Sequence, residues 1–184
     1  MKKPDWYVIQ VETGRERVAC ETILRTCEHM RASSQEGEST LRECFAPRYV
    51  TQVKLRGEFV DEERLLLPGY VIAVTERPWG LARILRATPG FMRILTMGKT
   101  FAPLSDDDRS WIERWTQEGD RTIPMSIAYK IGDTVVVTEG PLKGNEGMIT
   151  RIRRRKSLAE LEIHAGQLTI HTTVGLAVLP EPTG

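Results

Sequence analysis

The sequence contains few of the side chains that bind metals or form disulfides. Its 184 residues include three cysteines and three histidines. Cys20, Cys27 and Cys44 form no CxxC pair, and only His29 lies near a cysteine, on another face of the predicted helix. Metal sites need ligands at closer and more regular spacing, so we expect no metal, no cofactor and three reduced, partly buried thiols.

Long hydrophobic runs and catalytic motifs are also missing. No run of about 18 apolar residues is present to span a bilayer, and Met1 to Asp5 leads into a strand rather than a signal-peptide core. We therefore expect a cytoplasmic protein without membrane contact. The sequence lacks GxSxG, GxxxxGKS/T and HExxH, and although carboxylates or a Cys/His pair can meet in space without a motif, we expect a binding protein and not an enzyme.

The composition, 40% hydrophobic and 28% charged with a net charge of +1, suits one medium domain or two small ones. The pattern along the chain favours two, an α+β domain followed by a linker and an all-β domain. Thr13 can cap a helix from about Arg15, with Glu16 completing a capping box. Apolar residues then recur at helical spacing, and a polar loop is expected over 31–42. The apolar residues of this helix are Val18, Ile23, Leu24, Cys27 and Met30.

An antiparallel sheet is predicted after this loop. Strands are expected over residues 44–47, 49–55, 58–67, 69–74 and 91–95. Arg56 and Gly57 form a turn between two of them, and a short helix begins at Pro78 and ends near Thr88-Pro89-Gly90.

A run of carboxylates, Asp106 to Asp108, follows Ser105 at the start of another predicted helix, which ends at Gly119. Three adjacent aspartates could indicate a metal cluster, but they cannot all face one ion from a helix. Helix capping explains them better, because negative charge is favourable at a helix N-terminus. We assign them no chemistry.

The most informative segment runs from Ile131 to Ile149. Val135 and Val137 point to one side of a predicted strand, and the glycines from Gly140 to Gly147 supply turns that need positive φ. By itself this could be a generic hairpin of a small barrel. The glycine spacing between two apolar runs resembles that of a KOW motif.

Four further landmarks precede this motif. They are Trp6-Tyr7-Val8-Ile9-Gln10-Val11, Pro68-Gly69-Tyr70 with the apolar run after it, Trp79 with Arg83 and Thr88-Pro89-Gly90, and Pro103-Leu104-Ser105. In this order the chain resembles NusG, the bacterial transcription elongation factor family, over nearly its whole length. The resemblance implies an N-terminal NusG-type domain over 1–118, a linker over 119–128 and an SH3-like β-barrel over 129–184.

The barrel implied by this resemblance has five short strands. They are expected at about 133–138, 147–153, 159–164, 167–172 and 176–179, with Gly166 and Gly175 in two of the turns. β-branched residues are frequent in this part of the chain, so we expect a stable barrel and not a helical alternative fold.

The resemblance also implies where polymerase binds. Trp6, Leu67 and Tyr70 match the family positions of an apolar depression that docks on the clamp helices of RNA polymerase. Core packing is an alternative explanation, and for Trp6 it explains the residue equally well. Tyr70 is the most probable contact of the three.

A second group of positions matches the family region that faces upstream DNA. It consists of Arg83, Arg86 and Thr88. Ala87 stands where the family often has a polar residue. We therefore expect the arginines to contact DNA phosphates, and we do not expect base-specific contacts.

The run from Arg151 to Lys156 holds five cations in six positions, Arg151, Arg153, Arg154, Arg155 and Lys156. The first two share one face of a strand and the last three surround a turn, where they offer donors for phosphates or guanine edges. Lys143 in the KOW turn could extend this patch. A solvated turn balanced by Glu160 and Glu162 is the ordinary explanation of such a run, but its density favours RNA binding.

Asn145 occupies the turn position where general NusG proteins carry an aromatic residue that recruits Rho or a ribosomal protein. Loss of this anchor and gain of the arginines make the chain most similar to the LoaP branch of antiterminators. We therefore expect a monomer that docks on RNA polymerase and holds a structured element of nascent RNA with its KOW domain, which suppresses pausing and allows readthrough. The alternative is a NusG-type adaptor whose KOW domain binds protein, either the ribosome or Rho.

Overall fold

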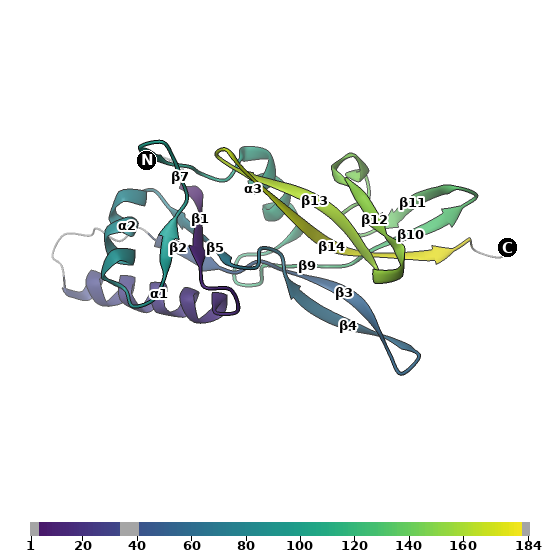
Figure 1. Cartoon of the computed structure of the whole chain (residues 1–184), viewed down its shortest axis with the longest axis horizontal. Helices are drawn as coiled ribbons and strands as arrows, with labels where there is room; N and C mark the ends of the chain where they lie inside the picture. Colours follow the sequence, from purple (N-terminus) through teal and green to yellow (C-terminus); the bar gives the residue numbers. More distant parts are fainter. Residues whose placement is uncertain (1–3, 34–40, 182–184) are drawn as a thin grey trace. The chain divides into compact units, whose positions relative to one another are not determined.

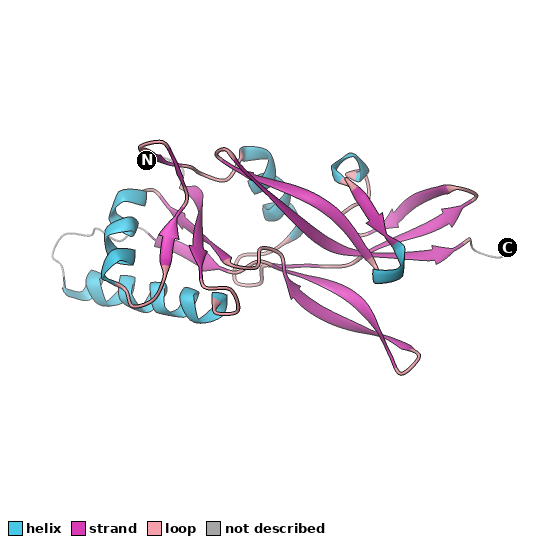
Figure 2. Ribbon diagram, in the orientation of Figure 1, coloured by secondary structure: helices cyan, strands magenta, loops and turns pink. Residues whose placement is uncertain are grey.

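The computed structural model describes residues 4–33 and 41–181 (Figure 1). Figure 2 shows helices and strands in the first part of the chain and mainly strands in the last part. The expected α+β fold with a C-terminal β-barrel is confirmed. The helices are α1 (Glu16–Ser33), α2 (Pro78–Ala87) and α3 (Asp106–Trp115), and two 3-10 turns are η1 (Glu146–Met148) and η2 (Arg154–Lys156).

The chain divides into two compact units that are discontinuous in sequence. Unit 1 comprises Met1–Pro47, Leu67–Ser110 and His164–Thr169, and unit 2 comprises Arg48–Leu66, Trp111–Ile163 and Ile170–Gly184. The predicted domains 1–118 and 129–184, with a linker over 119–128, stay predictions. The segment 119–128, expected to be a linker without periodicity, carries β9 (Thr122–Ile123) and the start of β10 (Ser126–Ile131).

Unit 1 contains a four-stranded sheet in the order β2-β5-β1-β6. Its strands are β1 (Asp5–Val11), β2 (Leu41–Phe45), β5 (Tyr70–Thr75) and β6 (Met92–Ile94). The core forms where the apolar faces of α1 and α2 pack against the sheet, and Ile9, Ile23 and Val71 are fully buried there. A two-stranded hairpin that the sequence did not predict, β7 (Thr96–Met97) and β8 (Thr100–Phe101), follows β6.

A buried carboxylate fixes the start of α1. Glu16 is 2% exposed, and its Oε1 accepts hydrogen bonds from the N–H groups of Gly14 at 3.1 Å and Gly69 at 2.7 Å. Burial acts to raise its pKa, but the backbone donors outweigh burial and hold the pKa of Glu16 below its usual value. The predicted capping box with Thr13 is therefore wrong. Arg15 provides the first helical acceptor, its carbonyl bonding to Ala19 N–H at 2.8 Å.

Two further expectations about α1 need correction. Val18, predicted on the packed face, is 41% exposed. The loop predicted over 31–42 is shorter, because α1 continues to Ser33 and β2 begins at Leu41; the rest of that loop lies outside the described residues.

The sequence placed β3 (Arg48–Leu55) and β4 (Glu58–Leu65) in the main antiparallel sheet, and this is wrong. They pair with each other about the predicted turn at Arg56 and Gly57, whose φ values are 51° and 94°. Their third partner is β9, in a separate sheet of order β4-β3-β9 in unit 2. The hairpin itself is local and predictable, whereas its sheet partner is distant in sequence.

The barrel of unit 2 has the strand order β11-β10-β14-β13-β12. Besides β10, its strands are β11 (Thr134–Glu139), β12 (Arg151–Arg153), β13 (Leu158–Ala165) and β14 (Leu168–Pro180). The second predicted strand is shorter than expected, since η1 occupies residues 146–148. The last two predicted strands are one continuous strand, β14.

Gly175 is the reason for this last error. The sequence placed it in a turn, but it lies inside β14, where a Cβ atom would come within 1.9 Å of the Val50 carbonyl oxygen. Its role is thus close approach of β14 to β3 and not turn formation. Hydrogen bonds reinforce the contact: Tyr49 Oη lies 2.7 Å from Thr173 Oγ1, and Thr172 Oγ1 donates to the Leu66 carbonyl.

We predict that Gly175→Ala lowers the free energy of unfolding by about 3 kcal/mol, because the methyl group meets backbone that cannot move aside. Urea unfolding followed by circular dichroism measures this change. Gly147→Ala is the matched control, since nothing lies within 4 Å of a Cβ at that position. Equal stability of the two variants would contradict the close approach.

We also predict that Glu16→Gln lowers the free energy of unfolding by about 2 kcal/mol at neutral pH, because it removes a charged acceptor of two backbone donors. A lowered folded-state pKa stabilises the fold above the ordinary glutamate value of 4.5, and this contribution disappears as the pH falls below it. The gap between variant and wild type should therefore shrink in acid.

Urea unfolding at neutral pH and at about pH 3 tests this sign. Glu28→Gln, at an exposed position of the same helix, should change little at either pH. A gap between Glu16→Gln and wild type that stays constant with pH would show that the carboxylate contributes by shape and not by charge.

Candidate functional site

The turn η2 carries the most distinctive charges of unit 2. Arg154, Arg155 and Lys156 are exposed there, and none of them makes an ion pair with any residue that the structure describes. Ser157 ends the turn with φ 52° and ψ 45°. Its carbonyl accepts hydrogen bonds from Thr51 Oγ1 and from Leu176 N–H, both at 2.9 Å. The three cations therefore stand on a turn that is bonded to two strands.

The strand part of the predicted patch is partly neutralised. Arg151 lies opposite Glu160 in the register of β12 and β13. Arg153 Nε bonds to Glu160 Oε1, so this arginine is engaged within the protein. The balancing role expected of Glu160 is thus seen for Arg153 and not for the turn, and Glu162 lies 3.5 Å from His171 Nδ1 instead.

Lys143 lies apart from the turn. It belongs to the segment before η1, and η1 and η2 lie at opposite ends of β12 (Figure 1). The pKa of Glu146 is lowered by a hydrogen bond from Gly144 N–H, by one from its own backbone N–H and, less strongly, by the charge of Lys143. The charge of Lys143 thus acts on a near neighbour in the chain. The Asn145 side chain donates to the Pro141 carbonyl at 3.0 Å, so this turn is satisfied internally.

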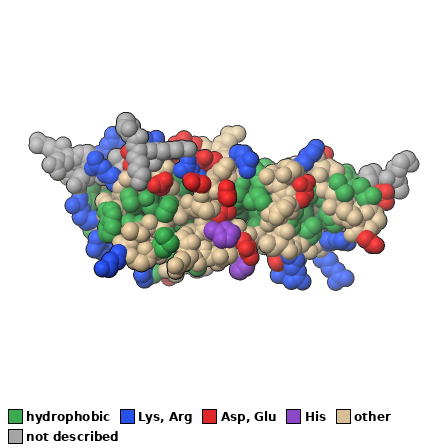
Figure 3. All heavy atoms as spheres, turned by 90° about the horizontal axis from the view of Figure 1, so that it is seen from above, with side chains coloured by type: hydrophobic (Ala, Val, Ile, Leu, Met, Phe, Trp, Pro, Cys, Tyr) green, Lys and Arg blue, Asp and Glu red, His purple; other side chains and the backbone are tan. Residues whose placement is uncertain are grey.

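One face of the molecule carries charges of both signs. On the face seen in Figure 3, acidic and basic side chains are interspersed, with blue Lys and Arg side chains projecting along parts of the edge. The chain as a whole is close to neutral, with a net charge of +1. The binding signal is therefore local and depends on which cations lack an internal partner.

The three residues matched to polymerase docking differ in exposure. Trp6 is 3% exposed with its ring edge-to-face on Phe45 at 5.3 Å, and Leu67 is 1% exposed. Tyr70 is half-buried and is the accessible member of the set. It ends a tight turn that Tyr70 N–H closes by bonding to the Leu67 carbonyl at 3.0 Å, with Gly69 at φ 82°.

Glu16 anchors this turn. Its carboxylate accepts Gly69 N–H, and the Gly69 carbonyl accepts Val11 N–H at 2.9 Å. The position of Tyr70 at the start of β5 is thus fixed by bonds on both sides of Gly69. No local pattern predicts this contact, because Glu16 and Gly69 are far apart along the chain.

The positions matched to upstream DNA are also unequal. Arg83 and Arg86 are exposed three residues apart on α2 and so share a face. Thr88 is 6% exposed, and its hydroxyl donates to the Ile84 carbonyl at 2.8 Å. Thr88 therefore ends α2 and does not present its hydroxyl to a ligand.

One hollow of unit 1 was not predicted from the sequence. It has a volume of about 350 Å³ and lies where the end of β1 and the first turns of α1 meet residues 89–92. Val18 and Phe91, 41% and 57% exposed, are among its lining residues. The available signal was Val18 itself, an apolar residue that we placed on the packed face.

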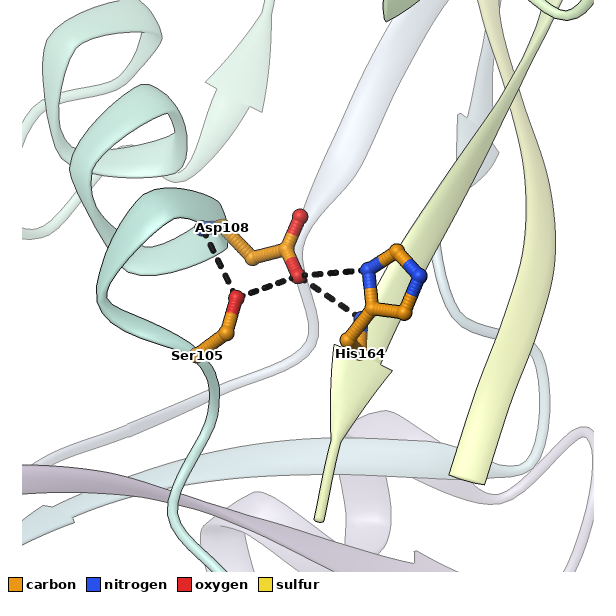
Figure 4. A network of polar contacts seen from close by, with 3 residues as sticks. All are labelled: Ser105, Asp108 and His164. Carbon is orange, nitrogen blue, oxygen red and sulfur yellow. Dashed lines mark hydrogen bonds and ion pairs between the residues drawn. The ribbon is translucent and has the colours of Figure 1, made fainter. Parts of the chain in front are cut away.

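Ser105, Asp108 and His164 form a polar network in unit 1 (Figure 4). Ser105 Oγ donates to Asp108 Oδ2 at 2.6 Å and accepts Asp108 N–H at 3.1 Å. The same Oδ2 accepts His164 N–H at 2.7 Å and lies 3.3 Å from its Nδ1. The Ser105 hydroxyl and the His164 ring both contact the carboxylate, and Ser105 meets His164 through its backbone N–H, which donates to the His164 carbonyl at 3.0 Å. The hydroxyl is therefore part of a helix cap and is not a nucleophile paired with a base.

Metal and thiol chemistry have little support in the part of the chain that the structure describes. No group of three or more His, Cys, Asp or Glu side chains there is placed to hold a metal ion. Cys20, Cys27 and Cys44, predicted to be reduced and partly buried, are buried thiols that form no disulfide. A hydrogen bond with Cys20 and burial raise the pKa of Cys44 well above its usual value, which disfavours the reactive thiolate. No helix of the described residues is long and apolar enough to cross a membrane.

Comparison with known proteins accounts for both parts of the chain. Residues 4–113 match the family described as "Transcription termination factor nusG", and residues 131–164 match the KOW motif. Among curated relatives, the "Transcription termination/antitermination protein NusG" of Rickettsia felis is 25% identical over 162 residues, covering 86% of this chain and 80% of the relative. The protein of the same description from Pseudomonas aeruginosa is 26% identical over 161 residues, covering 86% and 87%.

Among solved structures, the one titled "Domain interaction in Thermotoga maritima NusG" shares the fold. Its TM-score is 0.56 at 17% identity, and the match covers 95% of this chain and 94% of that chain. The family match covers more than half of the sequence and includes the landmarks from Trp6 to Ser105. The chain belongs to the NusG family of transcription termination/antitermination factors.

Proposed function

We propose that this chain is a specialised NusG-family antiterminator, most similar to the LoaP branch. It acts in the cytoplasm as a monomer, docks on RNA polymerase through its NusG part and holds a structured element of nascent RNA with its KOW part. Held at the polymerase, it suppresses pausing and allows readthrough of terminators. It needs no cofactor and catalyses no reaction.

The observation that carries this proposal is the turn η2. None of its three cations makes an ion pair with a described residue, and Ser157 bonds the turn to β3 and β14. Arginine donors held in place suit the phosphates of a folded RNA, because less side-chain and backbone freedom is lost on binding. Arg151 lies on the adjacent strand and extends the same group, while Arg153 is occupied by Glu160.

Polymerase docking is assigned to the turn that ends at Tyr70. The family positions of the clamp-helix contact fall on Trp6, Leu67 and Tyr70, and Tyr70 is the one with solvent access. An aromatic side chain on a rigid turn is a typical interface anchor. Arg83 and Arg86 on α2 would contact phosphates of upstream DNA.

Tethering explains how a modest RNA contact could be selective. Once the chain is docked on polymerase, RNA binding is intramolecular and depends on an effective concentration in the millimolar range. A turn with three free cations then suffices to hold one particular leader RNA, whereas the free protein would bind RNA weakly.

One observation favours the alternative, a KOW domain that binds the ribosome or Rho. Tyr129 pairs with Val136 on β11 and with Leu179 on β14, so the three side chains form a row across the outer face of the sheet. Val136 and Leu179 are each 40% exposed. An apolar row of this kind suits a protein partner better than RNA.

We predict that Tyr70→Ala weakens binding to bacterial core RNA polymerase by about tenfold or more, since it removes an aromatic anchor. Competition with housekeeping NusG for labelled polymerase measures the affinity. Tyr70→Phe keeps the ring and is the matched control. Binding of Tyr70→Ala at wild-type strength would remove Tyr70 from the docking site.

We further predict that the double change Arg154→Ala, Arg155→Ala abolishes readthrough only on templates that encode the leader RNA. The salt dependence of RNA binding should fall by about two phosphate contacts. Arg25→Ala with Arg31→Ala, two exposed arginines of α1, removes the same charge elsewhere and should leave readthrough intact. Unchanged leader-dependent readthrough in the η2 variant would favour the protein-binding alternative.

A further inference from the structure

The β3–β4 hairpin ends in three large apolar side chains that are exposed. Leu55 is 60% exposed, Phe59 63% and Val60 44%. Figure 1 shows the tip as the free end of a long ribbon, with no other element of unit 2 beside it. Isolated apolar residues on a surface are ordinary, but three on one tip form a patch of the kind that partners cover.

The strand register places these side chains on both faces of the ribbon. Val53 pairs with Val60 and Leu55 with Glu58, so Val53, Leu55 and Val60 share one face. Phe59 pairs with Lys54 on the opposite face. A flat partner would cover one face only, so the tip fits a cleft that surrounds it.

The charges of the hairpin are sorted along its length. On the part of the hairpin farther from the tip, here called the shaft, the acidic side chains have partners. Glu62 pairs with Arg64 at 2.6 Å, Glu63 pairs with Arg48 at 3.3 Å, and Asp61 accepts a hydrogen bond from Gln52 at 3.2 Å. These acidic groups are satisfied inside the hairpin. At the tip, Lys54 and Arg56 make no ion pair with any described residue, and Glu58 alone opposes them.

The other end of the hairpin is fixed. Tyr49 and Thr51 bond to Thr173 and to the Ser157 carbonyl, and the Val50 backbone rests against Gly175. The exposed part therefore extends from a rigid base. A tip held in this way loses little conformational freedom when a partner encloses it.

The hairpin also continues directly into the proposed polymerase contact. β4 ends at Leu65, and Leu67 and Tyr70 follow within the next turn. Each of its strands has eight residues, so the hairpin itself is about 25 Å long. A protein large enough to hold Tyr70 therefore has surface within reach of the tip.

We propose that the tip of the β3–β4 hairpin is a second docking element for RNA polymerase, and this rests on the proposed function. Leu55, Phe59 and Val60 enter an apolar cleft of the polymerase, and Lys54 and Arg56 meet carboxylates at its rim. The acidic side chains farther from the tip are already paired within the hairpin, whereas Lys54 and Arg56 make no ion pair with a described residue. The tip therefore presents positive charge, which fits an acidic rim on the partner. Two contacts on one rigid partner add their binding energies and hold the factor through long transcription.

The test uses the full chain and bacterial core RNA polymerase. The variant Leu55→Ser with Phe59→Ser should weaken polymerase binding by about tenfold in competition with housekeeping NusG. Ile131→Ser with Leu168→Ser removes two exposed apolar side chains outside the hairpin and should leave the affinity unchanged. Lys54→Glu with Arg56→Glu should weaken binding most at low salt, and it tests the same contact if the serine variant fails to fold.

The outcomes separate this inference from the function on which it rests. If Tyr70→Ala weakens polymerase binding but neither hairpin variant does, the inference is wrong and the proposed function stands. If the hairpin variants lose binding to leader RNA or upstream duplex DNA and keep polymerase affinity, the tip is a nucleic-acid contact and the inference is overturned. If the wild-type chain does not bind polymerase, both fail.

Discussion

The carboxylate of Glu16 joins the start of α1 to the turn before Tyr70, the residue proposed to contact polymerase. It is buried, which disfavours its charge, yet the N–H groups of Gly14 and Gly69 lower its pKa overall. One oxygen thus joins the start of α1 to the turn before β5. Because Tyr70 follows Gly69 directly, its orientation depends on a bond made by a residue of another element. A docking side chain on a turn is useful only if that turn is rigid, and Glu16 provides the rigidity.

In unit 2 the corresponding constraint is steric. β14 passes β3 so closely that only glycine fits at position 175. This approach brings Thr51 within bonding distance of the Ser157 carbonyl, at the end of the cationic turn η2. Ser157 takes a left-handed conformation that costs about 1 kcal/mol for a non-glycine residue, and its two hydrogen bonds offset that cost. The basic turn is therefore part of the packing between β3 and the barrel and not a loose loop.

Local patterns made much of the fold predictable. The turn at Arg56 and Gly57, the helix start at Pro78 and the cap at Ser105 each depend on neighbours within four residues, and all three are confirmed. The sheet that β3 and β4 join depends on β9, far along the chain, and was predicted wrongly. Gly175 shows a second limit, because a glycine needed for close approach looks the same in sequence as one needed for a turn.

The candidate sites show the same limit at the level of single side chains. The family position of Thr88 and the residue type of Arg153 led to the prediction that both contact nucleic acid. In the structure, the hydroxyl of Thr88 donates a hydrogen bond to the Ile84 carbonyl, and the guanidinium of Arg153 forms an ion pair with Glu160. Whether a polar group is free for a ligand depends on its neighbours in space, which one sequence does not reveal.

With a net charge of +1, this chain has little general attraction for nucleic acid, and its binding depends on charges left over after internal pairing. Acidic residues beside β12 and along the β3–β4 shaft take up the cations nearest to them. The unpaired cations of η2 and of the hairpin tip stand at the ends of elements, where the chain turns. A protein arranged in this way would bind weakly to nucleic acid in general. In the proposed mechanism its selectivity comes from polymerase docking, which brings one RNA into reach and leaves the others in bulk solution.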